Sequence, residues 1–146
     1  MKKMVDLTFL EFYFHGLTGR ADIDKEVTKY SSTNPDNEHQ IKQIISERLK
    51  PAVEKYPAQF QMQMQNALSY SLTTNAIEFG SLYDSQLLPF DHPTDPRLFF
   101  VWLWEVFYEN QSYLIPNSTD YNVIESNIND INDYFYSLQD QKKPLQ

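Results

Sequence analysis

The segment DPRLFFVWLWEVFYEN, residues 95–110, limits most strongly what this chain can fold into. Apolar and aromatic residues run without a break from Leu98 to Trp104, and three more follow Glu105. Asp95 followed by Pro96 favours a helix start, because the carboxylate caps free backbone N–H groups and proline fits the first turn. A helix that is apolar on nearly every side is buried. The segment therefore predicts a central buried helix over about 96–111.

The chain has the size and composition of one folded domain spanning 1–146. With 41% hydrophobic and 15% aromatic residues, it has enough apolar material for a core, and only 141–146 are expected to form a disordered tail. Cysteine is absent, which excludes disulfides and thiolate sites. Asp6 and Glu11 interrupt what would otherwise resemble a secretion signal, and no apolar run reaches the ~18 residues of a membrane span. We therefore expect a cytoplasmic protein without membrane contact.

Apolar residues at helical spacing recur along the rest of the chain. Leu7, Leu10 and Phe14 define one face of a first helix, and Gly16 is expected to end it in the left-handed conformation. Pro51 and Pro57 mark two boundaries in the middle of the chain. Further helices are expected at 22–30, 35–50, 52–56, 57–80, 81–88 and 118–138.

The last of these helices has the most regular pattern in the sequence. Ser118 or Thr119 is the expected cap, and the apolar stripe is short enough to favour one helix docked on a core over a coiled coil. Its members are spaced three and four residues apart: Tyr121, Ile124, Ile128, Ile131, Phe135 and Leu138. The sequence thus predicts an all-α, single-domain bundle of about six to eight helices around the buried aromatic helix.

The net charge of −8 is unevenly distributed. Residues 1–55 carry nine basic and nine acidic side chains, whereas residues 56–141 carry Arg97 against eleven acidic side chains, a net charge of −10. Such a layout disfavours direct contact with nucleic-acid phosphates. It favours either a basic partner or a simply solvated face.

Catalytic and cofactor signatures are absent from the sequence. The histidines have no metal-binding spacing, three glycines cannot build a phosphate loop, and no serine stands in a GxSxG elbow. We therefore expect no catalytic residue, no cofactor and no metal. One loop offers an alternative, since His92 and Asp95 place an imidazole near a carboxylate. Capping and turn formation already account for its aspartates.

Glu105 is a single charge within the aromatic helix. Arg97 lies eight positions earlier, too far to pair along the helix, and Glu109 lies one turn later and repels it. Two interpretations remain open: a buried acid with a perturbed pKa or a metal, and a carboxylate that faces water or accepts a hydrogen bond from a Tyr or Trp.

Tyrosines stand among the carboxylates of the acidic half. Tyrosine is favoured at protein interfaces, because it is apolar with a polar tip. A carboxylate face with tyrosines suits a basic protein surface such as a nuclease active site, where it competes with substrate phosphates. The predicted partner-binding residues are Asp84, Glu109, Tyr113, Asp120, Tyr121, Glu125, Asp130 and Asp133.

In its size, its lack of cysteine and its acidic, aromatic stretch from Glu105 to Asp140, the chain resembles small cytoplasmic immunity proteins. These proteins neutralise nuclease toxins of bacterial contact-dependent growth inhibition systems. The resemblance implies an inhibitor that occludes the active site of a cognate basic toxin, and it implies no residue roles, because that family is diverse in fold. The alternatives are a scaffold that self-associates through the C-terminal stripe and a metal-dependent enzyme built on His92 and Asp95.

Overall fold

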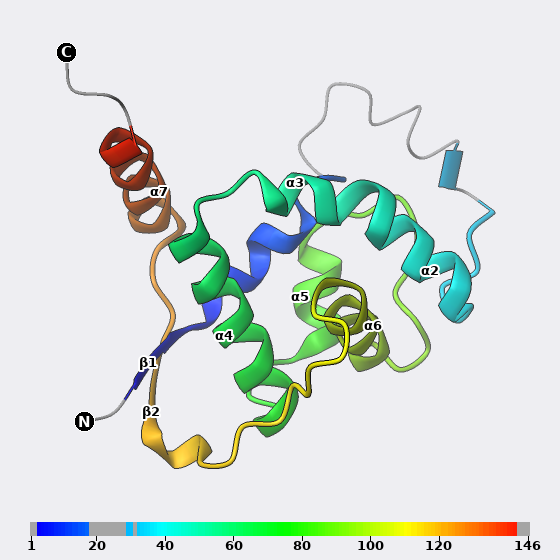
Figure 1. Ribbon diagram of the computed structural model, residues 1–146. Helices are drawn as coiled ribbons and strands as arrows, with labels where there is room; N and C mark the ends of the chain where they lie inside the picture. Colours follow the sequence, from blue (N-terminus) through cyan, green and yellow to red (C-terminus); the bar gives the residue numbers. More distant parts are fainter. Residues whose placement is uncertain (1–2, 18–28, 31, 143–146) are drawn as a thin grey trace.

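The computed structural model describes residues 3–17, 29–30 and 32–142, and it is mostly helical (Figure 1). The helix expected at 22–30 and the tail expected from 141 onward lie largely outside the described residues, although 141 and 142 still belong to the last helix. The elements are β1 (Lys3–Asp6), η1 (Leu7–Phe14), α2 (Glu38–Ile44), η2 (Ile45–Leu49), α3 (Lys50–Glu54), α4 (Ala58–Thr74), α5 (Phe79–Ser85), α6 (Arg97–Phe107), η3 (Ser118–Asp120), β2 (Tyr121–Ile124) and α7 (Ile128–Lys142).

Helix α6 carries the most apolar stretch of the sequence and is surrounded by α2, α4, α5 and η2. Phe99, Phe100 and Leu103 have no exposed surface. The ring of Phe99 stacks on Phe14 of η1 at 5.7 Å, and the ring of Phe100 lies 5.0 Å from Phe79 of α5. The burial expected for this segment is observed for five of its residues, whereas Leu98 and Glu105 are exposed and the helix ends at Phe107 instead of near residue 111. In the described part of the chain, none of the helices is long and apolar enough to cross a membrane.

The α2–η2–α3 segment is one continuous helical stretch with a widened turn. Asn37 caps α2, because its side chain accepts a hydrogen bond from the backbone N–H of Gln40 at 3.0 Å. The helix therefore begins three residues after the expected start at Pro35. Pro51 has no N–H to donate to the preceding turn, and the π-helical turn η2 stands immediately before it, where the sequence predicted a kink or an end.

Helix α4 ends earlier than its apolar spacing suggests. Asn75 is the C-cap residue of α4 and adopts the left-handed conformation with φ of 54°. Its backbone N–H donates to the carbonyl of Ser71. The Arg97 guanidinium donates to the Asn75 side chain at 3.0 Å and to the Leu72 carbonyl at 2.7 Å. The prediction that this helix continues to Gly80 is wrong, because Asn75 turns the chain and Gly80 lies within the separate helix α5.

The prediction of an all-α bundle is wrong. β1 and β2 form a parallel two-stranded sheet in which Lys3 pairs with Tyr121 and Asp6 pairs with Ile124 (Figure 1). The helix expected over 118–138 is therefore divided into η3, β2 and α7. The spacing of Tyr121 and Ile124 fits a helix, but pairing with the N-terminal strand over a long sequence separation overrides it.

Helix α7 docks through the C-terminal half of the predicted stripe. Ile131 and Leu138 are buried. The ring of Tyr134 stacks on Phe60 of α4 at 6.2 Å, and the ring of Phe135 meets the same phenylalanine edge-on at 5.6 Å. Figure 1 shows α7 beside the beginning of α4, toward one side of the molecule. This half of the stripe is thus occupied by packing within the chain.

The first helical element is a 3₁₀ helix, and Gly16 follows it for a different reason than expected. Its φ is not in the left-handed range. A Cβ at this position would instead collide with the backbone carbonyl of Arg48. The glycine therefore allows η1 to approach the η2 segment closely.

Candidate functional site

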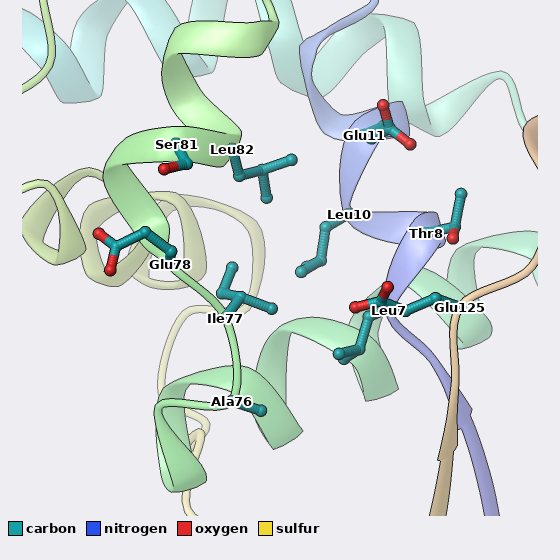
Figure 2. A pocket seen from close by; sticks show the side chains of 10 residues that line it. All are labelled: Leu7, Thr8, Leu10, Glu11, Ala76, Ile77, Glu78, Ser81, Leu82 and Glu125. Atoms are coloured by element: carbon teal, nitrogen blue, oxygen red, sulfur yellow. The ribbon is translucent and has the colours of Figure 1, made fainter.

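A hollow of about 430 Å³ opens between η1, the turn after α4, the beginning of α5 and the end of β2 (Figure 2). Its floor is apolar, because Leu10, Ile77 and Leu82 point toward one another across it. Its rim is acidic. The lining residues are Leu7, Thr8, Leu10, Glu11, Ala76, Ile77, Glu78, Ser81, Leu82 and Glu125.

Two sets of hydrogen bonds fix the backbone on either side of the hollow. On one side, the left-handed Asn75, held by Arg97, directs the chain from α4 toward Glu78. On the other side, the buried Asp6 carboxylate accepts hydrogen bonds from the N–H groups of Thr8 and Ser126, each at 3.1 Å. The Thr8 hydroxyl also donates to the Ser126 carbonyl at 2.8 Å. These bonds place the residue after β2 beside the beginning of η1.

The residues that line the hollow carry a net negative charge, because three of them are glutamates. Glu125 reaches from the end of β2 across Leu7, Glu11 stands at the rim on η1, and Glu78 lies on the opposite rim with its carboxylate turned outward (Figure 2). Neither Lys nor Arg is among the described residues that line the hollow. Glu11 accepts one long hydrogen bond, 3.5 Å, from the Gln86 side chain. An apolar floor beneath carboxylates suits the aliphatic stem and charged head of a Lys or Arg side chain.

Five of the predicted partner-binding residues follow one another along one segment of the chain, on η3, β2, the turn after β2 and α7: Asp120, Tyr121, Glu125, Asp130 and Asp133. The four carboxylates are exposed, and Tyr121 is half-buried. The Tyr121 ring lies 5.8 Å from that of Tyr70, and the Lys3 ammonium stands 5.9 Å above it. We call these five residues the acidic face.

The other three predicted residues are on different elements. Asp84 is exposed on α5, with one carboxylate oxygen 3.8 Å from Nε2 of His92. Glu109 lines a different hollow, which Lys42 and Glu105 also line. Tyr113 holds the segment after α6 in place, because its carbonyl accepts from the Ser69 hydroxyl at 2.6 Å. The structure does not bring these three residues to the acidic face.

Arg97 also has a structural role near this segment. Its guanidinium stands 5.6 Å from the centre of the Tyr113 ring. Arg97 is the only basic residue between positions 56 and 141 of the sequence. Its bonds to Asn75 and Leu72, together with this ring contact, join α4, α6 and the segment after α6. The acidic face therefore receives no compensating charge from Arg97.

Glu105 faces solvent. Its side chain is 45% exposed, and its carboxylate pairs at 3.1 Å with the Lys42 ammonium, which also pairs with Glu38 at 2.9 Å. Partial burial lowers the pKa of Lys42, and the bonds to the two glutamates outweigh this effect, so that the pKa is raised. Glu105 therefore lies on a solvent-exposed side of the aromatic helix.

The loop with His92 and Asp95 is held by turn contacts. The Pro93 carbonyl can only accept, so Nδ1 of His92 carries the proton in their 2.6 Å hydrogen bond. Asp95 accepts from the backbone N–H of Arg97 at 3.1 Å, at the start of α6. Asp36 accepts from the N–H and the hydroxyl of Thr94 at 2.7 and 2.9 Å, and these bonds lower its pKa. Among the described residues, no three His, Asp or Glu side chains gather where they could hold a metal ion.

Two tyrosine hydroxyls meet beneath α6. The Tyr13 and Tyr108 hydroxyls are 2.7 Å apart. Burial raises the pKa of both phenols, that of Tyr108 to about 12. The pair is thus neutral at physiological pH and links η1 to the end of α6.

Comparison with protein-family models, with curated proteins and with solved structures gave no match. The site is therefore interpreted from its own geometry. Glu11 and Glu78 are the rim residues that sequence reasoning did not select. Glu11 lies within an apolar stretch and Glu78 in a turn, and only tertiary contacts bring them to the hollow that Glu125 also lines.

Proposed function

We propose that the protein is an immunity protein that binds a cognate basic toxin of the nuclease type and blocks its active site. The observation that carries the proposal is the exposure of four carboxylates within one segment of the chain, together with the half-buried Tyr121: Asp120, Tyr121, Glu125, Asp130 and Asp133 on η3, β2, the turn after β2 and α7. A nuclease presents basic residues to the phosphates of its substrate. An exposed carboxylate face with a tyrosine competes for those residues.

The hollow adds a specific anchor to this face. Glu125 belongs to both, and the floor of Leu10, Ile77 and Leu82 lies directly beside it. One Lys or Arg side chain of the toxin would lay its stem on this floor and its charge near Glu125 and Glu11. A few side chains that fill desolvated pockets carry most of the binding energy of an interface, and such contacts act mainly on the dissociation rate. The proposal places the protein in a bacterial cytoplasm, where it meets the toxin.

Growth rescue tests the proposal. A nuclease toxin domain that the protein binds in a pull-down is expressed with and without the protein. We expect growth only with the protein and an about tenfold or greater loss of affinity for the double variant D130K/D133K. The matched control is E47K/E54K, which changes the net charge equally on the α2–α3 segment. Equal toxicity with and without the protein, or equal losses for both variants, would contradict the proposal.

Self-association is a second candidate with an observation of its own. Val123, Ile124 and Ile128 are 40%, 39% and 38% exposed on β2 and α7. These exposed apolar side chains stand among the carboxylates of this segment in the sequence. Light scattering at high protein concentration tests this candidate, because a stable dimer supports it and a monomer excludes it.

A further inference from the structure

β2 is the outer strand of the two-stranded sheet. β1 packs on α4, whereas Asn122, Val123 and Ile124 of β2 are exposed. In a paired strand, alternate residues direct their N–H and C=O groups to opposite sides. Half of the β2 backbone groups therefore face away from β1. Within residues 3–17, 29–30 and 32–142, no strand pairs with that side.

The free edge is short, at four residues, but it lacks three other devices that usually protect such edges. Soluble proteins place lysine, proline or a bulge on an exposed edge strand. The sequence of β2 is YNVI, and its four residues pair in unbroken register with β1. A two-stranded sheet on its own is also marginally stable, and a third strand would strengthen it. The outer edge is thus a ready template for an added strand.

The surroundings of the edge select the kind of strand. Asp120 precedes β2 and Glu125 follows it, and Asp130 lines a neighbouring hollow of about 220 Å³ together with Met4 and Ile124. A second copy of β2 in antiparallel pairing would bring Asp120 near Glu125, and like charges across strands are unfavourable. Basic side chains alternating with apolar ones complement both the carboxylates and the apolar hollow.

We propose that the outer edge of β2 takes up an extended segment of a basic protein as a third strand. The backbone of the segment hydrogen-bonds to β2, its Lys or Arg side chains lie near Asp120 and Glu125, and an apolar side chain rests on Met4 and Ile124. The proposal rests on the proposed function in requiring a basic partner. It goes beyond it by naming main-chain pairing as the mode of recognition.

A basic peptide that forms strands tests the pairing directly. The probe is Ac-Lys-Val-Arg-Val-Lys-Val-NH₂, titrated at low ionic strength into ¹⁵N-labelled protein. We expect saturable amide shifts centred on 121–125 and slower hydrogen exchange of alternate residues in β2. Two further peptides carry N-methyl groups on odd or on even residues, so their charge is unchanged and each loses one edge of hydrogen bonds. We expect one of them to bind about tenfold or more weakly and the other to bind like the parent.

The outcomes separate this inference from the proposed function. Equal binding of all three peptides, or shifts centred away from β2, would overturn strand addition. If that occurs while D130K/D133K still weakens binding of the toxin, the acidic face stands and only the main-chain pairing is wrong. If the charge variant also has no effect on the toxin, both proposals are wrong. Tighter binding of the acidic peptide Ac-Glu-Val-Asp-Val-Glu-Val-NH₂ would likewise overturn the choice of a basic segment.

Discussion

Replacing Asp6 with alanine is expected to loosen the join between the sheet and the beginning of η1. One carboxylate oxygen, Oδ1, accepts from the N–H of both Thr8 and Ser126 at 3.1 Å, and the residue is only 7% exposed. A hydrogen bond to a charged group contributes about 1.5–3 kcal/mol. Both donors share one oxygen, so their contributions do not add fully. We expect D6A to lower the free energy of unfolding by about 2–4 kcal/mol.

Urea unfolding monitored by tryptophan fluorescence and by circular dichroism measures this loss. D6N is the matched variant, because its amide oxygen still accepts both hydrogen bonds without the charge, and we expect a loss of about 1 kcal/mol. D130A, which removes an exposed carboxylate, controls for charge and should change stability by less than about 0.5 kcal/mol. A D6A protein as stable as the parent, or a D6N protein as unstable as D6A, would refute the stabilising role of the Asp6 hydrogen bonds.

Three other perturbations follow from the packing and the ionisable groups. F60A should lower the free energy of unfolding by about 3–5 kcal/mol and speed hydrogen exchange in α7, because the Tyr134 and Phe135 rings rest on Phe60. G16A should destabilise strongly in thermal melting, since its Cβ would meet the carbonyl of Arg48, whereas G80A should be milder because the nearest atom to its Cβ is a proline side chain at 3.3 Å. Stability should fall as pH rises above 10, because burial raises the pKa of Tyr108 to about 12 in the folded state, and Y108F should reduce this alkaline loss in melting experiments between pH 9 and about pH 11.

The sequence predicts the elements whose causes are local. An unbroken apolar run can only be a buried element, and α6 is one. Pro51 and Pro57 act through their missing N–H groups, so the widened turn before Pro51 and the start of α4 after Pro57 follow from the chain alone. The apolar spacing predicts too late an end for α4, because Asn75 in the left-handed conformation, held by Arg97 from α6, stops the helix before that spacing ends.

The sheet and the hollow depend on contacts between distant residues. β2 pairs with a strand more than a hundred residues earlier in the chain, and the spacing of Tyr121 and Ile124 cannot distinguish that strand from a helix. The same applies to the site. The sequence indicates Glu125 and the acidic residues around it as a group, because they are close in the chain, but it does not indicate that Glu11 and Glu78 join them.

The most direct test of the central claim is the association rate constant of the protein with the toxin domain recovered in the pull-down, measured by stopped-flow across a range of ionic strength. Recognition through the acidic face predicts fast association that slows steeply as salt increases. It also predicts that D130K/D133K slows association about tenfold or more at low salt while E47K/E54K has a much smaller effect. An association rate that is independent of salt and equal for both variants would contradict the claim.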